Sequence, residues 1–190
     1  QFETMQNQFG SEGFEEIEAL TVVDMLRREE MDIKMVSITG KEIVTGSHNI
    51  SVKADILFEK ADFTKTDMLI LPGGMPGTEN LRAFSPLKDL ICLFQREGKK
   101  LAAICAAPTV FGDLGILEGK RACCYPGMES QLKGAKVTEE KVEIDGNVIT
   151  SRGMGTAIPF GAAIIEIYKG KEAALNLKKK IVYGHMEEKA

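Results

Sequence analysis

Segments with helical periodicity alternate along this chain with short apolar segments that are typical of buried strands. Ile17, Leu20, Val23 and Leu26 repeat at helical spacing, and an apolar strand at 33–38 follows. This alternation predicts an α/β fold, a doubly wound and mostly parallel sheet with helices on both faces. Helices are expected at 17–28, 87–96, 107–114, 157–168 and 171–182, strands at 33–38, 68–71, 100–104, 120–124, around Val137 and within 142–150, and a hairpin at 42–53.

The first twelve residues do not fit this pattern. Their sequence, QFETMQNQFGSE, is polar and rich in glutamine, whereas the first strand of a doubly wound domain is usually central and apolar. We interpret 1–12 as an atypical polar segment, and three interpretations stay open: a flexible tail, an altered N-terminus, or a sequence uncertainty, since the chain opens with Gln1. No linker, repeat or low-complexity stretch divides 13–190, which are expected to form one domain.

Composition excludes several classes of function. A formal net charge of −4 without a dense basic patch argues against nucleic-acid binding. No apolar stretch approaches the roughly 18 residues of a membrane span, and no signal peptide is visible, so no membrane partner is expected. The cysteines show neither a CxxC pair nor disulfide-framework spacing, so we expect reduced thiols and a cytoplasmic location. Only His48 and His185 are available as imidazole ligands, and no metal site is predicted.

The segment KKLAAICAAP (99–108) contains the main candidate for chemistry. An apolar run leads to Cys105, and small residues and a proline follow at once, which is typical of a buried strand that breaks sharply into a helix. A thiol on such a bend lies at a helix N-terminus, where free N–H groups favour the thiolate. The arrangement is similar to the nucleophile elbow of hydrolases. The alternative is that Cys105 is simply a small buried apolar residue.

Two further segments are expected beside Cys105. Gly73 and Gly74 end the neighbouring strand at the carboxyl edge of the sheet, where α/β folds place ligands and where glycines let backbone N–H groups approach a ligand; the alternative is a tight turn without a further role. Glu15 and Glu16 are ordinary carboxylates of a helix start. Glu18 lies one turn into the helix beside core positions, where burial would favour its neutral, proton-donating form. The glycine-containing turn at 150–156 is interpreted as an edge of the site and not as a nucleotide loop.

Four ordered motifs, GFEEIEA, LPGGMPG, AAICAAP and TSRGMGTA, resemble the ThiJ/PfpI superfamily, in particular its branch with the parkinsonism-associated protein deglycase and its bacterial relatives. The resemblance covers roughly residues 13 to 183. It implies a flavodoxin-like fold and a homodimer. It also implies that Cys105 is an oxidation-prone nucleophile and that Glu18 is the carboxyl that hydrogen-bonds it.

The same resemblance assigns roles to the surrounding residues. Gly74 and Ala106 match the backbone donors that face a substrate oxygen or a cysteine sulfinate, and Gly73 shapes the same turn. Tyr125 stands where many members have a histidine, and because its pKa is ordinarily near ~10 it is a poorer base at neutral pH. His48 falls where relatives carry arginine at the rim of the pocket; the alternative is a surface histidine.

These implications lead to three hypotheses. The first is a cofactor-independent glyoxalase or protein deglycase, in which the Cys105 thiolate adds to methylglyoxal, glyoxal or their early adducts and Glu18 moves protons. The alternative is an oxidative-stress sensor or chaperone whose cysteine oxidises to sulfinate with little turnover. A cysteine peptidase or amidase is a weaker alternative, because those activities depend on a histidine beside the cysteine.

Overall fold

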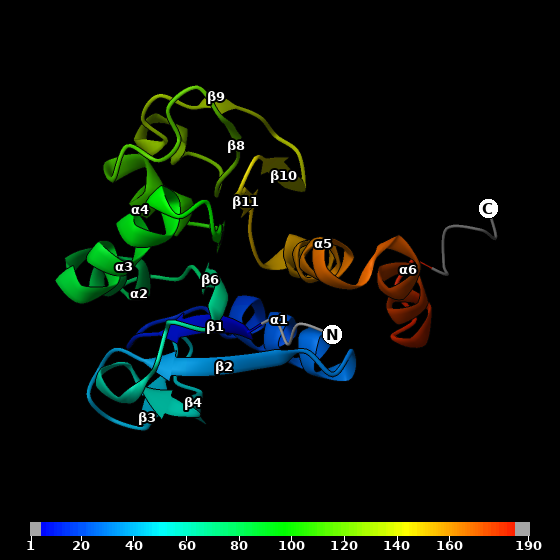
Figure 1. The fold of residues 1–190 in the computed structure, drawn as a ribbon, viewed down its shortest axis with the longest axis horizontal. Coiled ribbons are helices and arrows are strands. Elements are labelled where there is room, and N and C mark those ends of the chain that lie inside the picture. The colour runs from blue at the N-terminus through cyan, green and yellow to red at the C-terminus, as the bar shows by residue number, and fades with distance from the viewer. Residues whose placement is uncertain (1–4, 185–190) are drawn as a thin grey trace.

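The computed structural model describes residues 5–184, and its centre is a seven-stranded sheet (Figure 1). The strand order is β10-β11-β7-β6-β1-β2-β5, parallel except for the antiparallel β10–β11 pair at one edge. This is the predicted doubly wound, flavodoxin-like architecture. The strands of this sheet are β1 (Met5–Gly10), β2 (Asp32–Ser37), β5 (Ile56–Leu57), β6 (Thr66–Leu71), β7 (Lys100–Ile104), β10 (Val142–Asp145) and β11 (Val148–Ser151).

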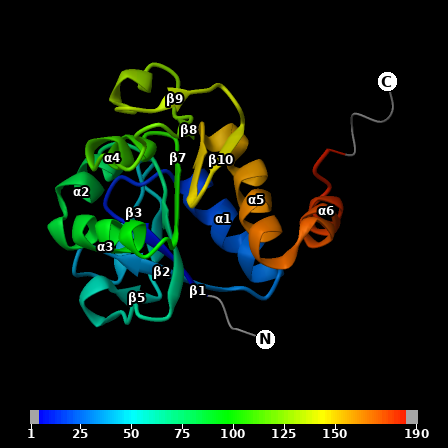
Figure 2. The same cartoon turned by 45° about the horizontal axis from the view of Figure 1, so that its top comes forward.

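Helices cover both faces of the sheet (Figure 2). One layer holds α1 (Glu16–Arg28), α5 (Ala157–Lys169) and α6 (Lys171–Lys180), and the other holds α2 (Gly77–Ala83), α3 (Ser85–Arg96) and α4 (Pro108–Asp113). Each layer encloses its own apolar core: Met25, Leu26 and Phe160 belong to the first, and Phe94 and Phe111 to the second. All of the expected helices are present, and α2 is an addition that the sequence pattern did not indicate.

The polar N-terminal segment is corrected by the structure. Met5–Gly10 form the strand β1 in the middle of the sheet, paired in parallel with both β2 and β6, so the interpretation as a flexible tail is wrong for these residues. Their side chains are buried although they are polar; for example, Gln8 Nε2 donates to the Ala19 carbonyl over 3.0 Å. Residues 1–4 lie outside the described part of the chain. Two backbone ladders and such internal hydrogen bonds replace the apolar run that a central strand usually has.

The small strands lie apart from the main sheet. The predicted hairpin is β3 (Ile43–Thr45) and β4 (Ser51–Lys53), which pair antiparallel. The strand expected at 120–124 is shorter, since only Arg121–Ala122 form β8, which pairs with β9 (Lys136–Val137) outside the main sheet. No helix in the described range is both long and apolar enough to cross a bilayer.

The strand order fixes where a site can form. From β1 the chain proceeds to β2 on one side, while β6 and β7 lie on the other side, so the direction of winding reverses at β1. In doubly wound sheets, ligands bind at the carboxyl ends of the strands beside such a reversal. The loops that leave β1, β6 and β7 therefore meet at one edge of the sheet.

Candidate active site

Cys105 occupies the sharp bend between β7 and α4, as predicted. Its backbone has φ = +65°, a left-handed conformation that costs a non-glycine residue roughly 1–3 kcal/mol. Two hydrogen bonds hold the bend: Cys105 N donates to the Ser151 carbonyl over 3.0 Å, and Tyr125 N donates to the Cys105 carbonyl over 2.8 Å. The surrounding loops therefore maintain a strained backbone at the residue with the candidate nucleophile.

The sulfur of Cys105 is nearly buried and faces hydrogen-bond donors. The residue is 7% exposed, and hydrogen bonding from the backbone N–H groups of Gly74 and Ala106 acts to lower its pKa. Burial, followed by the charge of Glu18 and the hydrogen bond to it, nevertheless raises the pKa of Cys105 to about 12. The backbone N–H groups at this bend favour the thiolate, as expected, but desolvation is the larger effect and the thiol pKa rises overall.

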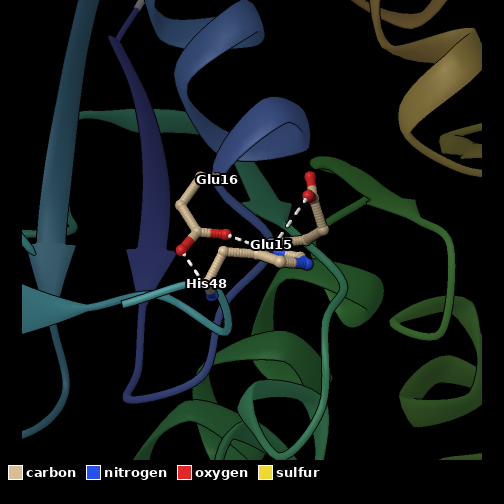
Figure 3. Close-up of side chains that lie close together, drawn as sticks. All are labelled: Glu15, Glu16 and His48. Atoms are coloured by element: carbon tan, nitrogen blue, oxygen red, sulfur yellow. Dashed lines mark hydrogen bonds and ion pairs between the residues drawn. The ribbon is translucent and has the colours of Figure 1, made fainter. Parts of the chain in front are cut away.

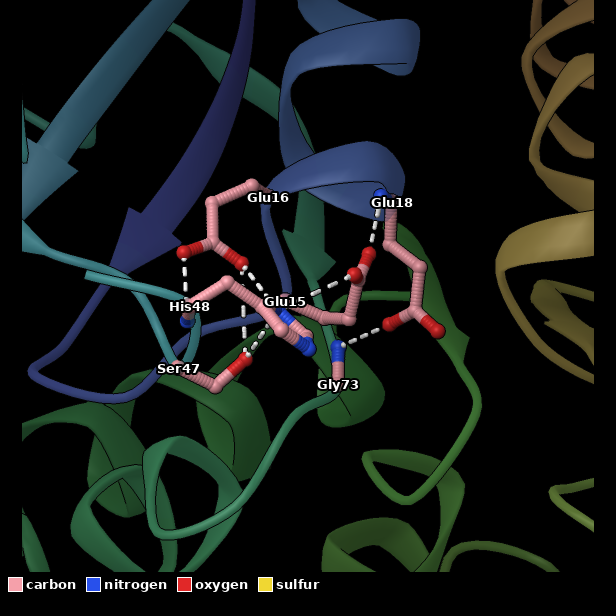
Figure 4. A network of polar contacts seen from close by, with 6 residues as sticks. All are labelled: Glu15, Glu16, Glu18, Ser47, His48 and Gly73. Atoms are coloured by element: carbon pink, nitrogen blue, oxygen red, sulfur yellow. Dashed lines mark hydrogen bonds and ion pairs between the residues drawn. The ribbon is translucent and has the colours of Figure 1, made fainter. Parts of the chain in front are cut away.

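Glu18 is the carboxyl beside this sulfur, and Figure 4 shows its contacts with Gly73 and Glu15. It is 1% exposed, its Oε2 accepts a hydrogen bond from Gly73 N over 2.9 Å, and its backbone N–H is capped by Glu15 Oε2 at 2.8 Å. Burial is the largest influence and raises the pKa of Glu18 to about 7, against the opposing hydrogen bonds from Cys105 and Gly73. Two of the causes that raise the pKa of Cys105 depend on Glu18, so a proton on Glu18 removes the charge that opposes a thiolate.

Gly73 and Gly74 are required by close backbone packing. A Cβ on Gly73 would lie 2.6 Å from Cys105 Cβ and 2.6 Å from Glu18 Oε2. Gly74 has φ = +93°, and a Cβ there would meet Glu15 N and lie 2.7 Å from the Gly13 carbonyl oxygen. The two glycines thus let the β6 loop touch both α1 and the nucleophile bend.

Gly74→Ala is expected to lower the free energy of unfolding by roughly 3 kcal/mol, because the clashing partners are backbone atoms and φ is positive. Urea unfolding followed by circular dichroism measures this. Gly155→Ala is the matched control, since no atom lies within 4 Å of the added Cβ, and its effect is expected within about 0.5 kcal/mol. Equal stability of the two variants would contradict the packing argument.

Glu15, Glu16 and His48 form a second cluster, between the start of α1 and the β3–β4 hairpin (Figure 3). His48 Nδ1 lies 2.9 Å from Glu16 Oε2 and 3.9 Å from Glu15 Oε1, and His48 N donates to Glu16 Oε1 over 2.7 Å. Burial acts to raise the pKa of Glu16, but the hydrogen bonds from His48 outweigh it and lower that pKa. Hydrogen bonding to Glu16, supported by its charge, raises the pKa of His48.

Glu15 is a helix-start carboxylate as expected, since it is the N-cap of α1, but both Glu15 and Glu16 are 4% exposed, and Glu16 also holds His48. Within the described residues these three have the spacing of metal ligands. Both oxygens of Glu16 already accept from His48, and Glu15 Oε2 accepts from Glu18 N. The cluster therefore functions as a hydrogen-bonded brace between α1 and the β3–β4 hairpin. His185 lies outside the described residues.

A pocket of about 500 Å³ opens above Cys105. It brings together three of the predicted site residues, Gly74, Ala106 and Tyr125, with Cys105 itself. Tyr125 is 45% exposed at the rim, and its ring lies against Gly153, where a Cβ would be 3.5 Å from it. The lining residues are Glu15, Ser47, His48, Gly74, Met75, Cys105, Ala106, Tyr125, Pro126, Gly127, Met128 and Met154.

Sequence reasoning missed part of this lining. The turn at 150–156 was expected at the edge of the site; Met154 lines the pocket, and Ser151 supports the Cys105 backbone. Met75 and Met128 had no signal in the sequence beyond their nearness to Gly74 and Tyr125. His48, placed by the resemblance at the rim, does line the pocket.

Comparison with known proteins gives one consistent result. The sequence profile of the DJ-1/PfpI family matches residues 9–167. Protein DJ-1 homolog B from Arabidopsis thaliana is 39% identical over 90% of this chain, and protein dj-1beta from Drosophila melanogaster is 35% identical over 91% of this chain and 94% of its own length. This chain spans only 39% and 43% of the two Arabidopsis relatives.

A more distant relative and a solved structure extend this result. A Pyrococcus abyssi protein named as a deglycase is 28% identical over 82% of this chain and 94% of its own length. The solved structure of oxidised Toxoplasma gondii DJ-1 superposes with a TM-score of 0.91 at 32% identity, and covers 96% of this chain and 100% of that one. The fold is thus shared with these proteins.

Proposed function

The chain belongs to the DJ-1/PfpI family, and on that premise we propose that it is a cofactor-independent glyoxalase or deglycase that acts through Cys105 on methylglyoxal, glyoxal or their early adducts. The observation that supports this most directly is the pairing of Cys105 with Glu18, a buried carboxyl whose pKa is raised to about 7. A group that titrates near neutral pH can both accept and return a proton. The relative named as a deglycase is consistent with such a reaction.

The first step is addition of the sulfur to the aldehyde carbon. As the S–C bond forms, the thiol proton passes to Glu18, and the electron pair of the C=O bond moves to the oxygen. We assign the stabilisation of this oxyanion to the N–H groups of Gly74 and Ala106, which also act to lower the pKa of the Cys105 thiol. The oxyanion then takes a proton from Glu18 and gives a hemithioacetal.

The second step moves hydrogen between the two carbons. Glu18 removes the proton from the former aldehyde carbon and returns it to the neighbouring carbonyl carbon, while the proton on the hemithioacetal oxygen passes to the ketone oxygen. The product is a thioester of the 2-hydroxy acid. Water then breaks the S–C bond, releases lactate from methylglyoxal or glycolate from glyoxal, and restores the thiol. One water is added overall and no oxidant is needed.

The test is lactate formation from methylglyoxal by the purified protein without glutathione or added metal. We expect enzymatic determination to find lactate that accumulates in proportion to protein concentration. A chiral assay provides the control, since an enzyme that returns the proton within a shaped pocket is expected to form one enantiomer in excess. Absence of lactate under these conditions would reject the glyoxalase.

A redox role is a second candidate. The donors that would hold an oxyanion, together with Glu18 when it is protonated, are equally suited to the oxygens of a cysteine sulfinate. Peroxide would supply the oxygen atoms. Intact-mass measurement after mild peroxide treatment separates the two candidates: uptake of two oxygen atoms at Cys105 without lactate formation would favour the sensor.

A peptidase or amidase has less support. Among residues 5–184 no imidazole hydrogen-bonds Cys105, and His48 Nδ1 is held by Glu16. Tyr125 stands at the rim through its backbone bond to Cys105 and does not replace a histidine base.

We also propose that the protein forms a homodimer. Ile17 follows Glu16 on α1, and Ile50 lies in the β3–β4 hairpin, whose His48 hydrogen-bonds Glu16; the two isoleucines are 53% and 52% exposed. Exposed apolar side chains that gather on one face indicate an interface. Sedimentation analysis is expected to give twice the 20.8 kDa of one chain, and a monomer at micromolar concentration would contradict the proposal.

A further inference from the structure

The pocket above Cys105 has two walls of different chemistry. One wall is polar and is formed by Glu15, Ser47 and His48. The other is apolar, and its residues come from the loops after β6, β8 and β11: Met75, Tyr125, Pro126, Met128 and Met154. Nothing in the proposed proton transfer between Cys105 and Glu18 requires this apolar wall.

The apolar wall is unusually open to solvent. Met75 is 51% exposed, Tyr125 45% and Met154 40%, and these are three of the eleven large apolar side chains that are exposed on the described surface. Apolar side chains that gather around a concave site, from separate segments of the chain, indicate a surface that is covered by a ligand. Gly74, which precedes Met75, also supplies an N–H that faces the sulfur. Met75, the first residue of the apolar wall, therefore directly follows a residue that contacts the Cys105 sulfur.

The size of the pocket leads to the same conclusion. About 500 Å³ is within the range that holds ligands considerably larger than a three-carbon aldehyde. With methylglyoxal bonded to Cys105, the methyl group would leave most of the methionine surface in contact with water. A larger apolar substituent would remove that surface from water and gain binding free energy.

We propose that Met75, Tyr125 and Met154 select 2-oxoaldehydes whose ketone carbon carries a branched alkyl or aryl group. This proposal rests on the proposed function and names its substrate class. The aldehyde carbon bonds to Cys105, the oxygen lies at the Gly74 and Ala106 N–H groups, and the substituent lies on the apolar wall. Methionine is unbranched and polarisable, so this wall accommodates substituents of differing shape.

The test compares methylglyoxal with 4-methyl-2-oxopentanal, which differs only in having an isobutyl group in place of the methyl. Both ketone carbons carry alkyl groups, so the intrinsic reactivity of the aldehydes is similar. We expect kcat/KM to be at least about tenfold higher for the isobutyl compound. Equal or lower kcat/KM for the isobutyl compound, with methylglyoxal turned over, would overturn this proposal and leave the proposed function standing.

Variants of single residues test whether the preference for the isobutyl compound comes from the apolar wall. Met154→Gln keeps the length of the side chain and makes it polar, and is expected to lower the ratio of the two kcat/KM values about fivefold. Leu175→Gln is the matched control: Leu175 is 45% exposed on α6, outside the pocket, and the ratio is expected to stay unchanged. An unchanged ratio in Met154→Gln would remove that residue from the specificity wall.

A second measurement does not depend on turnover. Alkylation of Cys105 by N-phenyl iodoacetamide and by iodoacetamide is followed by intact mass. Each rate is corrected for the labelling of a Cys105→Ser protein. It is then divided by the rate at which the same reagent alkylates a small thiol in solution. We expect the phenyl reagent to be favoured about tenfold, and less so in Met154→Gln. If no aldehyde is turned over but this preference is found, the proposed function is rejected, whereas the selectivity of the pocket for apolar groups is supported. If the phenyl reagent has no advantage, the apolar selectivity is rejected.

Discussion

Replacing Cys105 with serine is expected to reduce lactate formation from methylglyoxal by about a thousandfold or more. Glu18 is the charged group that acts on this buried position, and a serine hydroxyl there is a much poorer nucleophile than a thiol. The substitution removes no large volume, and it keeps the backbone bonds to Ser151 and Tyr125 that hold the bend. Circular dichroism and the melting temperature should therefore remain close to those of the parent protein.

Cys123→Ser is the matched control for this experiment. Cys123 is fully buried, with Sγ 3.6 Å from Thr150 Oγ1, but unlike Cys105 it does not line the pocket. Turnover is expected to stay within about twofold of the parent, as for other changes that leave the reacting groups in place. If Cys105→Ser retained turnover, or if Cys123→Ser lost as much as Cys105→Ser, the nucleophile would have to be another group.

The fold could be predicted wherever the pattern of apolar residues along the sequence matches the residues that a helix or strand buries. The helix α1 was found because its apolar positions repeat at helical spacing, and the strand β7 was found as an apolar run and predicted with its observed bounds. β1 was missed because its residues are not apolar: Gln6, Asn7 and Gln8 are buried and polar, and the hydrogen-bond partners of Asn7 and Gln8 lie on other elements. Asn7, for example, donates to Thr66. A pattern of hydrophobicity cannot show that a glutamine will find a buried partner.

The site could be predicted to the extent that local sequence determines it. Cys105 on its bend and the glycines after β6 are set by neighbouring residues, so a short motif was enough to place them. The brace between Glu16 and His48 joins residues 32 positions apart, and only the fold shows it. The raised pKa of Cys105 could not be predicted for a related reason. It depends on how deeply the assembled loops bury the sulfur and on the charge of Glu18.

Glu18→Gln is expected to reduce turnover about a hundredfold or more while it makes Cys105 easier to alkylate at pH 8. Glutamine cannot take or return the proton that the rearrangement requires. It also carries no charge, so two of the causes that raise the pKa of Cys105, the charge of Glu18 and the hydrogen bond to it, are weakened. Each unit by which the thiol pKa falls increases the thiolate fraction about tenfold. Steady-state lactate formation and iodoacetamide labelling of Cys105 measure the two effects separately.

The same substitution changes how stability depends on pH. The pKa of Glu18 is about 7 in the folded protein against an ordinary 4.5, so the folded state holds this proton more tightly than the unfolded chain does. The resulting stabilisation is fully present below pH 4.5, is lost as the pH rises through about 7, and amounts to roughly 3 kcal/mol. Glutamine does not titrate, so the stability of Glu18→Gln relative to the parent should improve by about that amount between pH 5 and pH 8.

Urea unfolding at pH 5 and pH 8 gives this difference directly, and Glu16→Gln serves as the control because the pKa of Glu16 is lowered instead of raised. In that control, stability relative to the parent should not improve with pH, since a lowered pKa stabilises the folded state at the higher pH. The pKa values of Glu18 and Glu16 are shifted in opposite directions although both are buried in the same turn of α1. A general effect of pH on the fold would act on both variants alike, so the comparison excludes it. A constant difference between Glu18→Gln and the parent would show that Glu18 is already ionised at pH 5, and the proton transfers assigned to it would then need another donor.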